Sequence, residues 1–420
     1  MKPPVLILGA VPRIAIPIAR SLHDYGIPVD VATFSPVEKS LCSHAIRNFY
    51  RLPDPDPAPS VFADAVCQLI RMHEHDTLIP CNDVALTAIV EHYERFRDLL
   101  HVCCPPPDTL RYILNKNLTL QVAEKCGIRV PRSVLVSSSA KVPEFASAFG
   151  YPVILKPNEK RRSEDFKVCL IRSADHLETV FPQPRIFSSP MLLQEFCHGD
   201  GVGVEVLRHN RTLIAAFQHR RRKELPHTGG VAVLATSEST DPGLVHSTSC
   251  LLDALHCDGL AMVEFKVNPR DGTSVLMEVN GRYWGSISLP ILAGFNFPLF
   301  HWKVLHDEPP EVPTVYRTGL QWRWSAGYLR RFHDLMLGAL RAGSSRDVLL
   351  HDLHYLRADF ADSRDPLWTR SDPMPAMLEV IGMFQNLIRS DFSTGYRRLS
   401  RRPAAVLKRA KHFKTPIGNS

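Results

Sequence analysis

Apolar strands and amphipathic helices alternate along the first 110 residues, and this order constrains the fold more than any other feature of the chain. Short buried strands are predicted at Val5–Leu8, Val29–Thr33, Thr77–Pro80 and His101–Cys104. The helices between them are predicted over about Ile14–Tyr25, after a cap at Ser60 and after a cap at Asp83. Strands that alternate with helices form a parallel sheet with helices on both faces, so we predict an α/β domain over residues 1–110.

The composition limits the class of protein. Hydrophobic residues make up 45% of the 420 positions, which excludes an intrinsically disordered chain. No apolar run reaches the ~18 residues of a membrane-spanning helix, and the N-terminus lacks the layout of a signal peptide. The ten cysteines are scattered without the spacing of a zinc site, which favours reduced thiols. We therefore expect a cytoplasmic protein.

The net charge of +7 comes from the C-terminal tail. Eight Lys and Arg residues and no acid lie between Arg397 and Lys414, and the rest of the chain has 42 basic and 43 acidic residues. The spacing in the tail, residues 397–420, is that of a weakly amphipathic basic helix that would touch an anionic membrane; a solvated, frayed terminus is the alternative. No specific nucleic-acid partner is expected, because the basic run His219–Lys223 has no interleaved aromatic residues.

A helix and a series of strands are predicted after residue 110. The helix spans Leu110–Cys126, and the strands are Tyr151–Pro157, Val168–Arg172, Met191–Phe196, Val202–Leu207, Thr212–Phe217, Leu260–Val267 and Ser274–Asn280. Beyond about Asp307–Pro310 the pattern changes to helical segments. Domain boundaries are therefore predicted near residues 110 and 310.

The last two of these strands form a hairpin that carries acids among apolar neighbours. Glu264 lies in the first strand, and Glu278 and Asn280 lie two apart in the second, so the latter two share a face that Glu264 can join. Two carboxylates and an amide oxygen are hard ligands suited to Mg²⁺. The alternative is an ordinary solvent-exposed sheet face. Arg282 follows at once, where it would bind a phosphate or carboxylate, or neutralise Glu278.

The order of these motifs resembles that of ATP-grasp enzymes. Asn115-Lys116, Lys156 in VILKP, Gln194-Glu195-Phe196, Glu264 in VEF and Glu278, Asn280 and Arg282 in MEVNGR occur in the order seen in that superfamily. Gly229–Val231, Trp284–Ser286 and Ala293–Pro298 are similar to its carbamoyl-phosphate-synthase-like branch of carboxylate–amine ligases. The resemblance implies an N-terminal Rossmann-like domain (1–110), a two-lobed ATP-grasp domain (111–310, lobes about 111–190 and 191–310) and a mainly helical C-terminal segment (311–420).

The resemblance also implies roles for individual residues. Lys116 and Lys156 would meet the nucleotide phosphates, although exposed lysines are the alternative. The segment Gln194, Glu195, Phe196 and Cys197 would bind adenine mainly through its backbone, with Glu195 as the side chain expected to contribute. Glu264, Glu278 and Asn280 match the ligands of Mg²⁺, with Mn²⁺ as a substitute, and Arg282 matches the arginine that steadies an acyl phosphate.

Two segments depart from this pattern or leave a choice open. The loop 158–167, where many ATP-grasp proteins have a glycine-rich lid, contains no glycine, so either its basic residues form the lid or it is a mixed-charge surface loop. In the run 219–224, Arg220 or Arg222, which alternate on one strand face, is expected to approach the reacting phosphate.

These observations predict an ATP- and Mg²⁺-dependent ligase that joins a carboxylate to an amine through an acyl phosphate. Its partners would be two small-molecule substrates, with a homodimer left open. The alternative is an ATP-binding regulatory protein of the same fold without ligase activity. A nicotinamide-dependent enzyme is disfavoured, because no GxGxxG sequence follows the first strand. The sequence does not identify the substrates, which depend on the shape of the pocket.

Overall fold

The parallel sheet predicted at the N-terminus is present. In this computed structural model, which describes residues 2–34, 38–56, 58–160, 168–176, 187, 189–342 and 345–400, five parallel strands lie in the order β3-β2-β1-β4-β5. They are β1 (Val5–Leu8), β2 (Val29–Thr33), β3 (Asn48–Arg51), β4 (Thr77–Pro80) and β5 (His101–Val102). The strand β3 was not predicted from the sequence, because its residues are only partly buried at the sheet edge.

Helices cover both faces of this sheet, because β1 presents apolar side chains to each of the two faces. Val5 and Ile7 pack in one core with α1 (Pro12–His23), whereas Leu6 and Leu8 pack in another with α2 (Pro59–His73) and α3 (Asp83–Glu91). The short α4 (Tyr93–Arg97) follows α3. The predicted α/β fold class is confirmed.

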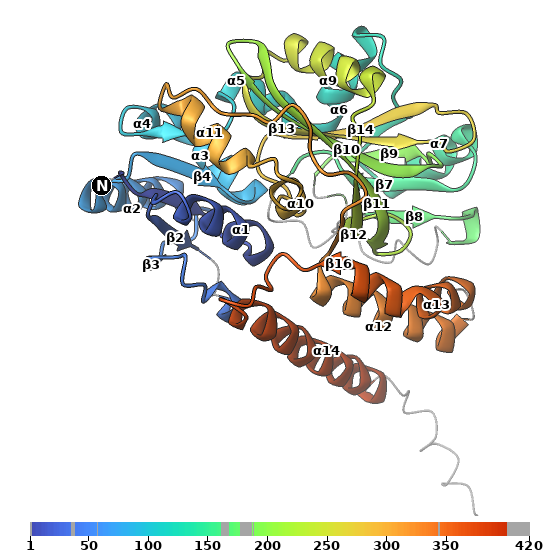
Figure 1. Cartoon of the computed structure of the whole chain (residues 1–420). Coiled ribbons are helices and arrows are strands. Elements are labelled where there is room, and N and C mark those ends of the chain that lie inside the picture. The colour runs from blue at the N-terminus through green and yellow to red at the C-terminus, as the bar shows by residue number, and fades with distance from the viewer. Residues whose placement is uncertain are drawn as a thin grey trace, which may run out of the picture.

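Two sheets follow along the chain, one antiparallel and one antiparallel except for the parallel pair of β15 and β16 (Figure 1). The four-stranded sheet has the order β6-β9-β7-β8, and its strands are β6 (Ser133–Val136), β7 (Val153–Pro157), β8 (Cys169–Ile171) and β9 (Met191–Glu195). The helix α7 (Val142–Phe149) packs on this sheet, and together they enclose a small apolar core around Leu155 and Leu193.

The larger sheet has the order β14-β13-β10-β11-β12-β15-β16. Its strands are β10 (Asp200–His209), β11 (Thr212–Leu225), β12 (Val231–Glu238), β13 (Gly259–Val267), β14 (Ser274–Asn280), β15 (Gln321–Arg323) and β16 (Ser363–Arg364). The helices α9 (Pro242–Ala254), α10 (Ser288–Ala293) and α11 (Phe297–Leu305) belong to the same stretch of chain. Because β11 is 14 residues long, it carries the whole basic run into the sheet.

The C-terminal segment is mainly helical, as predicted. It contains α12 (Ser325–Ala342), α13 (Arg346–Asp362) and α14 (Met374–Ser400). Two short strands, β15 and β16, were not predicted, and they add this segment to the edge of the larger sheet. The helix α14 packs against the short 3₁₀ turn η1 (Lys39–Leu41), so the last described helix contacts the N-terminal region (Figure 1). The domain boundaries near 110 and 310 remain predictions.

Three predictions of helix boundaries were wrong. The single helix predicted over Leu110–Cys126 is two helices, α5 (Pro107–Ile113) and α6 (Lys116–Lys125), because Asn115 caps the second by accepting a hydrogen bond from the Leu118 amide. The helix α2 begins at Pro59 instead of after Ser60, since proline is favoured in a first turn. Asn82, and not Asp83, caps α3.

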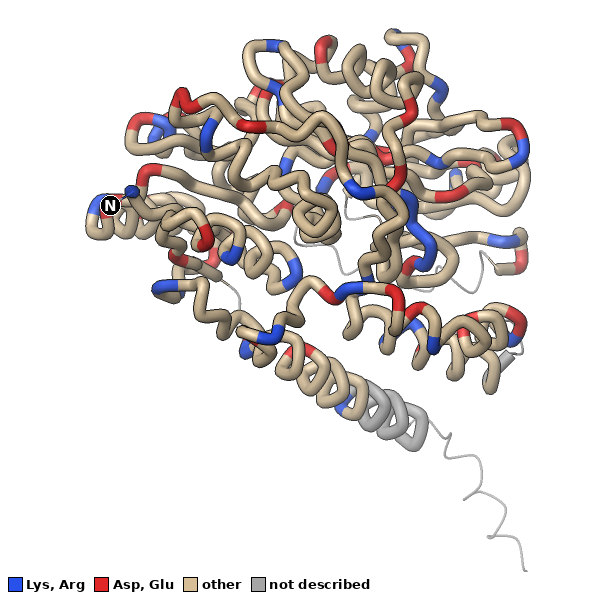
Figure 2. The backbone as a smooth tube through the Cα atoms, in the orientation of Figure 1, with Lys and Arg blue, Asp and Glu red and all other residues tan. Residues whose placement is uncertain are grey.

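Charged residues of both signs are spread over the described part of the chain. Basic and acidic positions are interspersed along the backbone in Figure 2 instead of gathering on one side. Within the described ranges, no helix combines the length and the apolar character needed to cross a bilayer. All ten cysteines are free thiols, and only Cys42 is exposed.

Candidate functional site

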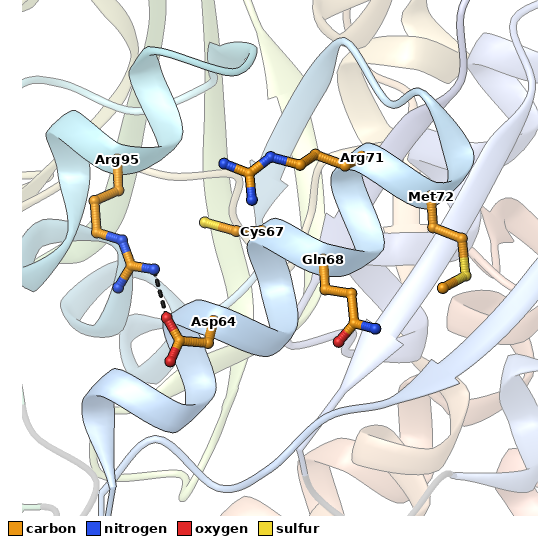
Figure 3. A pocket seen from close by; sticks show the side chains of 6 residues that line it. All are labelled: Asp64, Cys67, Gln68, Arg71, Met72 and Arg95. Atoms are coloured by element: carbon orange, nitrogen blue, oxygen red, sulfur yellow. Dashed lines mark hydrogen bonds and ion pairs between the residues drawn. The ribbon is translucent and has the colours of Figure 1, made fainter.

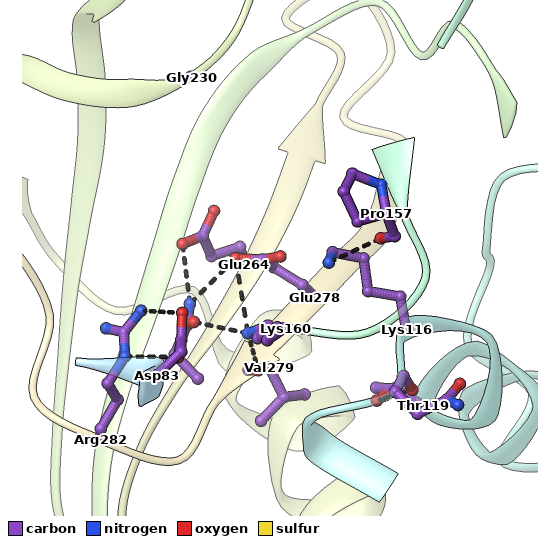
Figure 4. Close-up of polar contacts among 12 residues, drawn as sticks. Asp83, Lys116, Thr119, Pro157, Lys160, Gly230, Glu264, Glu278, Val279 and Arg282 are labelled. Carbon is purple, nitrogen blue, oxygen red and sulfur yellow. Dashed lines mark hydrogen bonds and ion pairs between the residues drawn. The ribbon is translucent and has the colours of Figure 1, made fainter. Parts of the chain in front are cut away.

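The three predicted metal ligands lie together on one face of the larger sheet. Glu264 of β13 pairs directly with Glu278 of β14, and Met262 pairs with Asn280. The Asn280 Nδ2 donates hydrogen bonds to Glu264 Oε1 at 3.0 Å and to Glu278 Oε1 at 3.3 Å (Figure 4). A bulge after Glu264 shifts the register, so Glu264 and Glu278 stay side by side. The hairpin therefore gathers two carboxylates and one amide at a single point.

Three lysines surround these acids. The Lys160 Nζ donates to Asn280 Oδ1 at 2.8 Å and to the Val279 carbonyl at 2.9 Å, and it lies 3.9 Å from Glu278 Oε1. Burial alone would raise the pKa of Glu278, but the charges of Lys160, Lys116 and Lys156 outweigh it and lower that pKa to about 2. Glu278 is therefore a stable anion at neutral pH, as a metal ligand must be.

Lys116 lies in α6 and Lys156 in the smaller sheet, and their charges act on this cluster. Lys116 begins α6, and its Nζ donates to the Pro157 carbonyl at 3.0 Å. Lys156 is buried in β7, and among the described residues its ammonium has neither a hydrogen bond nor an ion pair. Burial lowers the pKa of Lys156 to about 8, partly offset by Glu278. Lys156 thus carries a positive charge that the described protein leaves available to an anionic ligand.

A fourth cation, Arg221, was not predicted. Its Nη2 lies 2.5 Å from Glu264 Oε2, and its Nη1 donates to Glu224 and to the Gly230 carbonyl. Burial would lower the pKa of Arg221, but Glu264 and Glu224 raise it well above its usual range. The side chain fits because Gly201 faces it: a Cβ at that position would lie 2.9 Å from Arg221 Cδ.

The two arginines expected to approach the phosphate do not contact the acid cluster. Arg220 pairs with Glu238 at 2.6 Å and with Asp200 at 3.1 Å. Arg222 lies 3.7 Å from the same Glu238. Successive strand residues point to opposite faces, so Arg221 shares the face of Glu264 while its neighbours point away. The glycines opposite Arg221 and His219, at positions 201 and 203, were the available signal for this choice.

Arg282 is held by an acid at the start of α3. Its Nε donates to Asp83 Oδ1 at 2.7 Å and its Nη2 to Asp83 Oδ2 at 2.9 Å, a bidentate pair. Burial would raise the pKa of Asp83, but Arg282 and Lys160 lower it well below its usual range. The interaction joins residues 199 positions apart, and it shows that Asp83 faces this site instead of capping a helix.

The segment expected to bind adenine lies at the end of β9. Gln194 is buried, its Nε2 donates to Ser133 Oγ at 2.9 Å, and its Oε1 has no hydrogen-bond partner. Glu195 accepts from the Arg132 amide at 3.0 Å and from Arg132 Nε at 2.6 Å. Phe196 contacts His198, and burial raises the pKa of the Cys197 thiol. The Glu195 carboxylate is thus already engaged, and Gln194 has the unpaired polar atom.

The donor set suits a divalent cation bound together with phosphate oxygens. Among the described residues, no group of three or more His, Cys, Asp or Glu side chains is arranged around a common point. Two carboxylates and the Asn280 amide supply oxygens only, which is the preference of Mg²⁺ when phosphates complete its shell. The Lys160 ammonium lies beside these oxygens, and its positive charge takes the place of a metal cation. The residues present therefore fit Mg²⁺.

Two further predictions lie wholly or partly outside the described residues. Of the loop 158–167, only residues 158–160 are described, and of these Lys160 contacts the acid cluster. The side chains of the basic tail, 397–420, also lie outside the described part of the chain. Both the lid and the membrane contact remain predictions.

The chain is similar to ATP-grasp proteins. Residues 187–328 match a family described as ATP-grasp in the biosynthetic pathway with Ter operon. D-aspartate ligase from Enterococcus faecium is 23% identical over 63% of the chain and 67% of its own length. The carbamoyl phosphate synthase large chain from a Thermotoga species is 25% identical over 56% of the chain, but the chain spans only 23% of that relative.

Solved structures show the same fold. The biotin carboxylase domain of 2-oxoglutarate carboxylase from Hydrogenobacter thermophilus, solved as a dimer with MgADP and bicarbonate, matches with a TM-score of 0.59 and 13% identity. The match covers 76% of this chain and 73% of that one. The predicted resemblance to ATP-grasp proteins of the carbamoyl-phosphate-synthase-like branch is therefore confirmed.

Proposed function

We propose that this protein is an ATP- and Mg²⁺-dependent ligase that joins the carboxylate of one small molecule to the amine of another. The observation that carries this proposal is the cluster of Glu264, Glu278 and Asn280 opposite Lys156. Oxygen ligands next to a buried lysine that has no partner among the described residues match the charge pattern of a nucleotide triphosphate with its metal ion. The similarity to D-aspartate ligase favours an amino acid as one substrate.

The chain's own residues divide the work of binding. Lys116 and Lys156 would hold the phosphate chain, and the end of β9 would hold adenine through backbone groups and the free Gln194 Oε1. Glu264, Glu278 and Asn280 would hold Mg²⁺. When bound, this ion would neutralise negative charge on the phosphate oxygens. Lys160 lies among these ligands, so nucleotide binding would displace its ammonium toward the phosphates.

The reaction would then proceed in two balanced steps. An oxygen of the substrate carboxylate bonds to the γ-phosphorus as the bond to ADP breaks, which yields an acyl phosphate. The amine nitrogen next bonds to the acyl carbon, inorganic phosphate leaves, and the amine loses a proton. Arg282, fixed by its two hydrogen bonds to Asp83, would stabilise the negative charge on the acyl phosphate. Arg221 would orient Glu264.

A coupled ADP-release screen tests this proposal. Purified full-length protein receives ATP, Mg²⁺ and a panel of amino acids and other carboxylates, each with and without amines. We expect ADP release that depends on one carboxylate and on Mg²⁺, and that is lost with EDTA and restored by excess Mg²⁺ or Mn²⁺. ATP binding without ADP release across the panel would instead support the regulatory alternative.

A further inference from the structure

The guanidinium of Arg13 has no ion-pair partner among the described residues, and it lies against Gly285, three residues after Arg282. Arg13 is in the first turn of α1, and its Nε and Nη1 are shielded from solvent. Neither atom has a hydrogen-bond partner, and Arg13 forms no ion pair with any residue in the described ranges. A shielded cation without a partner is costly in a folded protein, so such a group points to a ligand.

The surroundings hold this side chain in place by shape and by an aromatic ring. The guanidinium carbon lies 3.9 Å from the centre of the Trp324 ring. On another side, a Cβ at Gly285 would lie 3.0 Å from Arg13 Nε, so a larger residue there would crowd the guanidinium. Trp324 is itself fixed, because its Nε1 donates to Glu379 Oε2 of α14 at 3.0 Å. Three distant segments therefore position one arginine.

The acids near Arg13 compensate its charge only in part. Burial and the nearby Asp365 raise the pKa of Glu379 to about 8, so this acid is mostly neutral at pH 7. Burial lowers the pKa of Arg13 to about 10, with a further contribution from the like charge of Arg282, while Glu379 and Glu38 oppose this shift. Arg13 therefore remains cationic at neutral pH.

We propose that Arg13 binds a carboxylate of the substrate that does not react, at a subsite formed by α1, Gly285, Trp324 and Glu379. The planar guanidinium matches a carboxylate, and it lies against Gly285, three residues after Arg282, so a carboxylate bound here would lie on the Arg282 side of the site. The inference rests on the proposed function and narrows it: the substrate bound here has at least one charged carboxylate besides the groups that form the new bond. An amino acid or a dicarboxylic acid satisfies this requirement.

A binding experiment without ATP tests the subsite directly. The unfolding midpoint of the full chain is measured with rising concentrations of amino acids, malonate, succinate and, separately, inorganic phosphate, because a ligand that binds the folded state raises this midpoint. We expect at least one carboxylate to stabilise the wild type and to lose this effect in Arg13→Met. Stabilisation by phosphate alone, or by every carboxylate equally in wild type and Arg13→Met, would overturn the proposal.

Control variants separate a local effect from misfolding. Arg71 of α2 lies on the opposite face of the N-terminal sheet, at the rim of a surface hollow of about 510 Å³ where Asp64 and Arg95 already pair (Figure 3). Arg71→Met should respond to carboxylates as the wild type does. Arg13→Lys keeps the charge and should retain part of the response. Gly285→Ala, which intrudes on the Arg13 side chain, should weaken the response without removing any charge.

Turnover then identifies the group that Arg13 holds. For a substrate found by ADP release, replacing the unreacted carboxylate by a carboxamide should lower kcat/KM in the wild type by about 10- to 150-fold, the range for a hydrogen bond to a charged group. In Arg13→Met the acid and the amide should react equally well, and the KM for ATP should stay unchanged. Discrimination as strong as in the wild type would contradict the assignment. Carboxylate binding that requires Arg13 but no ADP release would instead refute only the proposed ligase function.

Discussion

Two buried clusters of charge include residues of β11, and they differ in how many of their charged groups have a partner within the chain. In the cluster of the C-terminal segment, the Lys223 Nζ contacts Tyr328 Oη at 2.9 Å, Asp359 at 2.6 Å and Asp352 at 3.1 Å. Arg331 completes it with a hydrogen bond to Asp352 at 2.8 Å. Each of these four charged side chains has a partner of opposite charge within the chain.

The cluster at the candidate site is incomplete by comparison. Among the described residues Lys156 has no partner, Arg221 Nε has no hydrogen bond, and the two acids share the single amide of Asn280. Two residues apart on one strand, Arg221 and Lys223 thus belong to clusters of different kinds. We infer that a cluster in which every charged side chain is paired has a structural role. A cluster with an unpaired charged side chain is instead a site for a ligand.

The largest effect is expected on stability, from Lys223→Met. Removing one partner of a buried ion pair leaves uncompensated charge, so Lys223→Met should lower the free energy of unfolding by about 3–5 kcal/mol. Urea denaturation measures this change. Arg330→Met is the matched control, because its pair with Asp334 is exposed on both sides and should contribute less than about 1 kcal/mol. A Lys223→Met protein as stable as the wild type would contradict the structural role of the Lys223 cluster.

Glu278→Gln should affect activity above all. The substitution keeps the shape but removes a carboxylate that three lysines hold charged, so kcat should fall by about 10²–10³-fold. The unfolding midpoint should also fall, because the three lysines lose the opposite charge that lowers the pKa of Glu278. The exposed Glu124 of α6 provides the control, and Glu124→Gln should leave ADP release unchanged. Full activity in Glu278→Gln would mean that this acid is not a metal ligand.

The third prediction concerns pH. The pKa of Lys156 is lowered to about 8, so its positive charge is present below that pH and is lost above it. We expect kcat/KM for ATP to fall about tenfold per pH unit above pH 8. Lys156→Arg, which stays charged, should flatten the profile up to about pH 10. A profile that is flat in the wild type, or falls equally in both proteins, would argue against phosphate binding by Lys156.

The smallest effect is expected from Glu195. Its carboxylate already accepts hydrogen bonds from the Arg132 amide and side chain, and this pair is partly exposed. Glu195→Gln should therefore change the KM for ATP by less than about fivefold. A larger increase in the KM for ATP, measured in the same ADP-release assay, would support the direct contact between Glu195 and adenine that the sequence suggested.

Local patterns in the sequence predicted the acid hairpin and Arg282, but not the contact of Arg221 with Glu264. Glu264, Glu278 and Asn280 are close in sequence, and the alternation of a strand fixes their common face. The choice between Arg220, Arg221 and Arg222 depends on the register of β11 with β10, which a single strand does not encode.

Long-range contacts were beyond local patterns as well. Asp83 was predicted to cap its own helix, whereas its carboxylate pairs with Arg282, which follows the end of β14. The contacts of Arg13 with Trp324, and of Trp324 with Glu379, depend on how the C-terminal segment packs. Such contacts follow from tertiary packing, and no helix or strand propensity records them.

Trapping of an acyl phosphate with hydroxylamine tests the central claim most directly. The full-length protein is incubated with ATP, Mg²⁺, hydroxylamine and each carboxylate of the panel, without an amine substrate. The account predicts a hydroxamate from at least one carboxylate, formed in equal amount with ADP by the wild type and lost in Glu278→Gln. If no carboxylate gives a hydroxamate, or if Glu278→Gln forms as much as the wild type, the acid cluster is not the centre of a carboxylate-activating ligase.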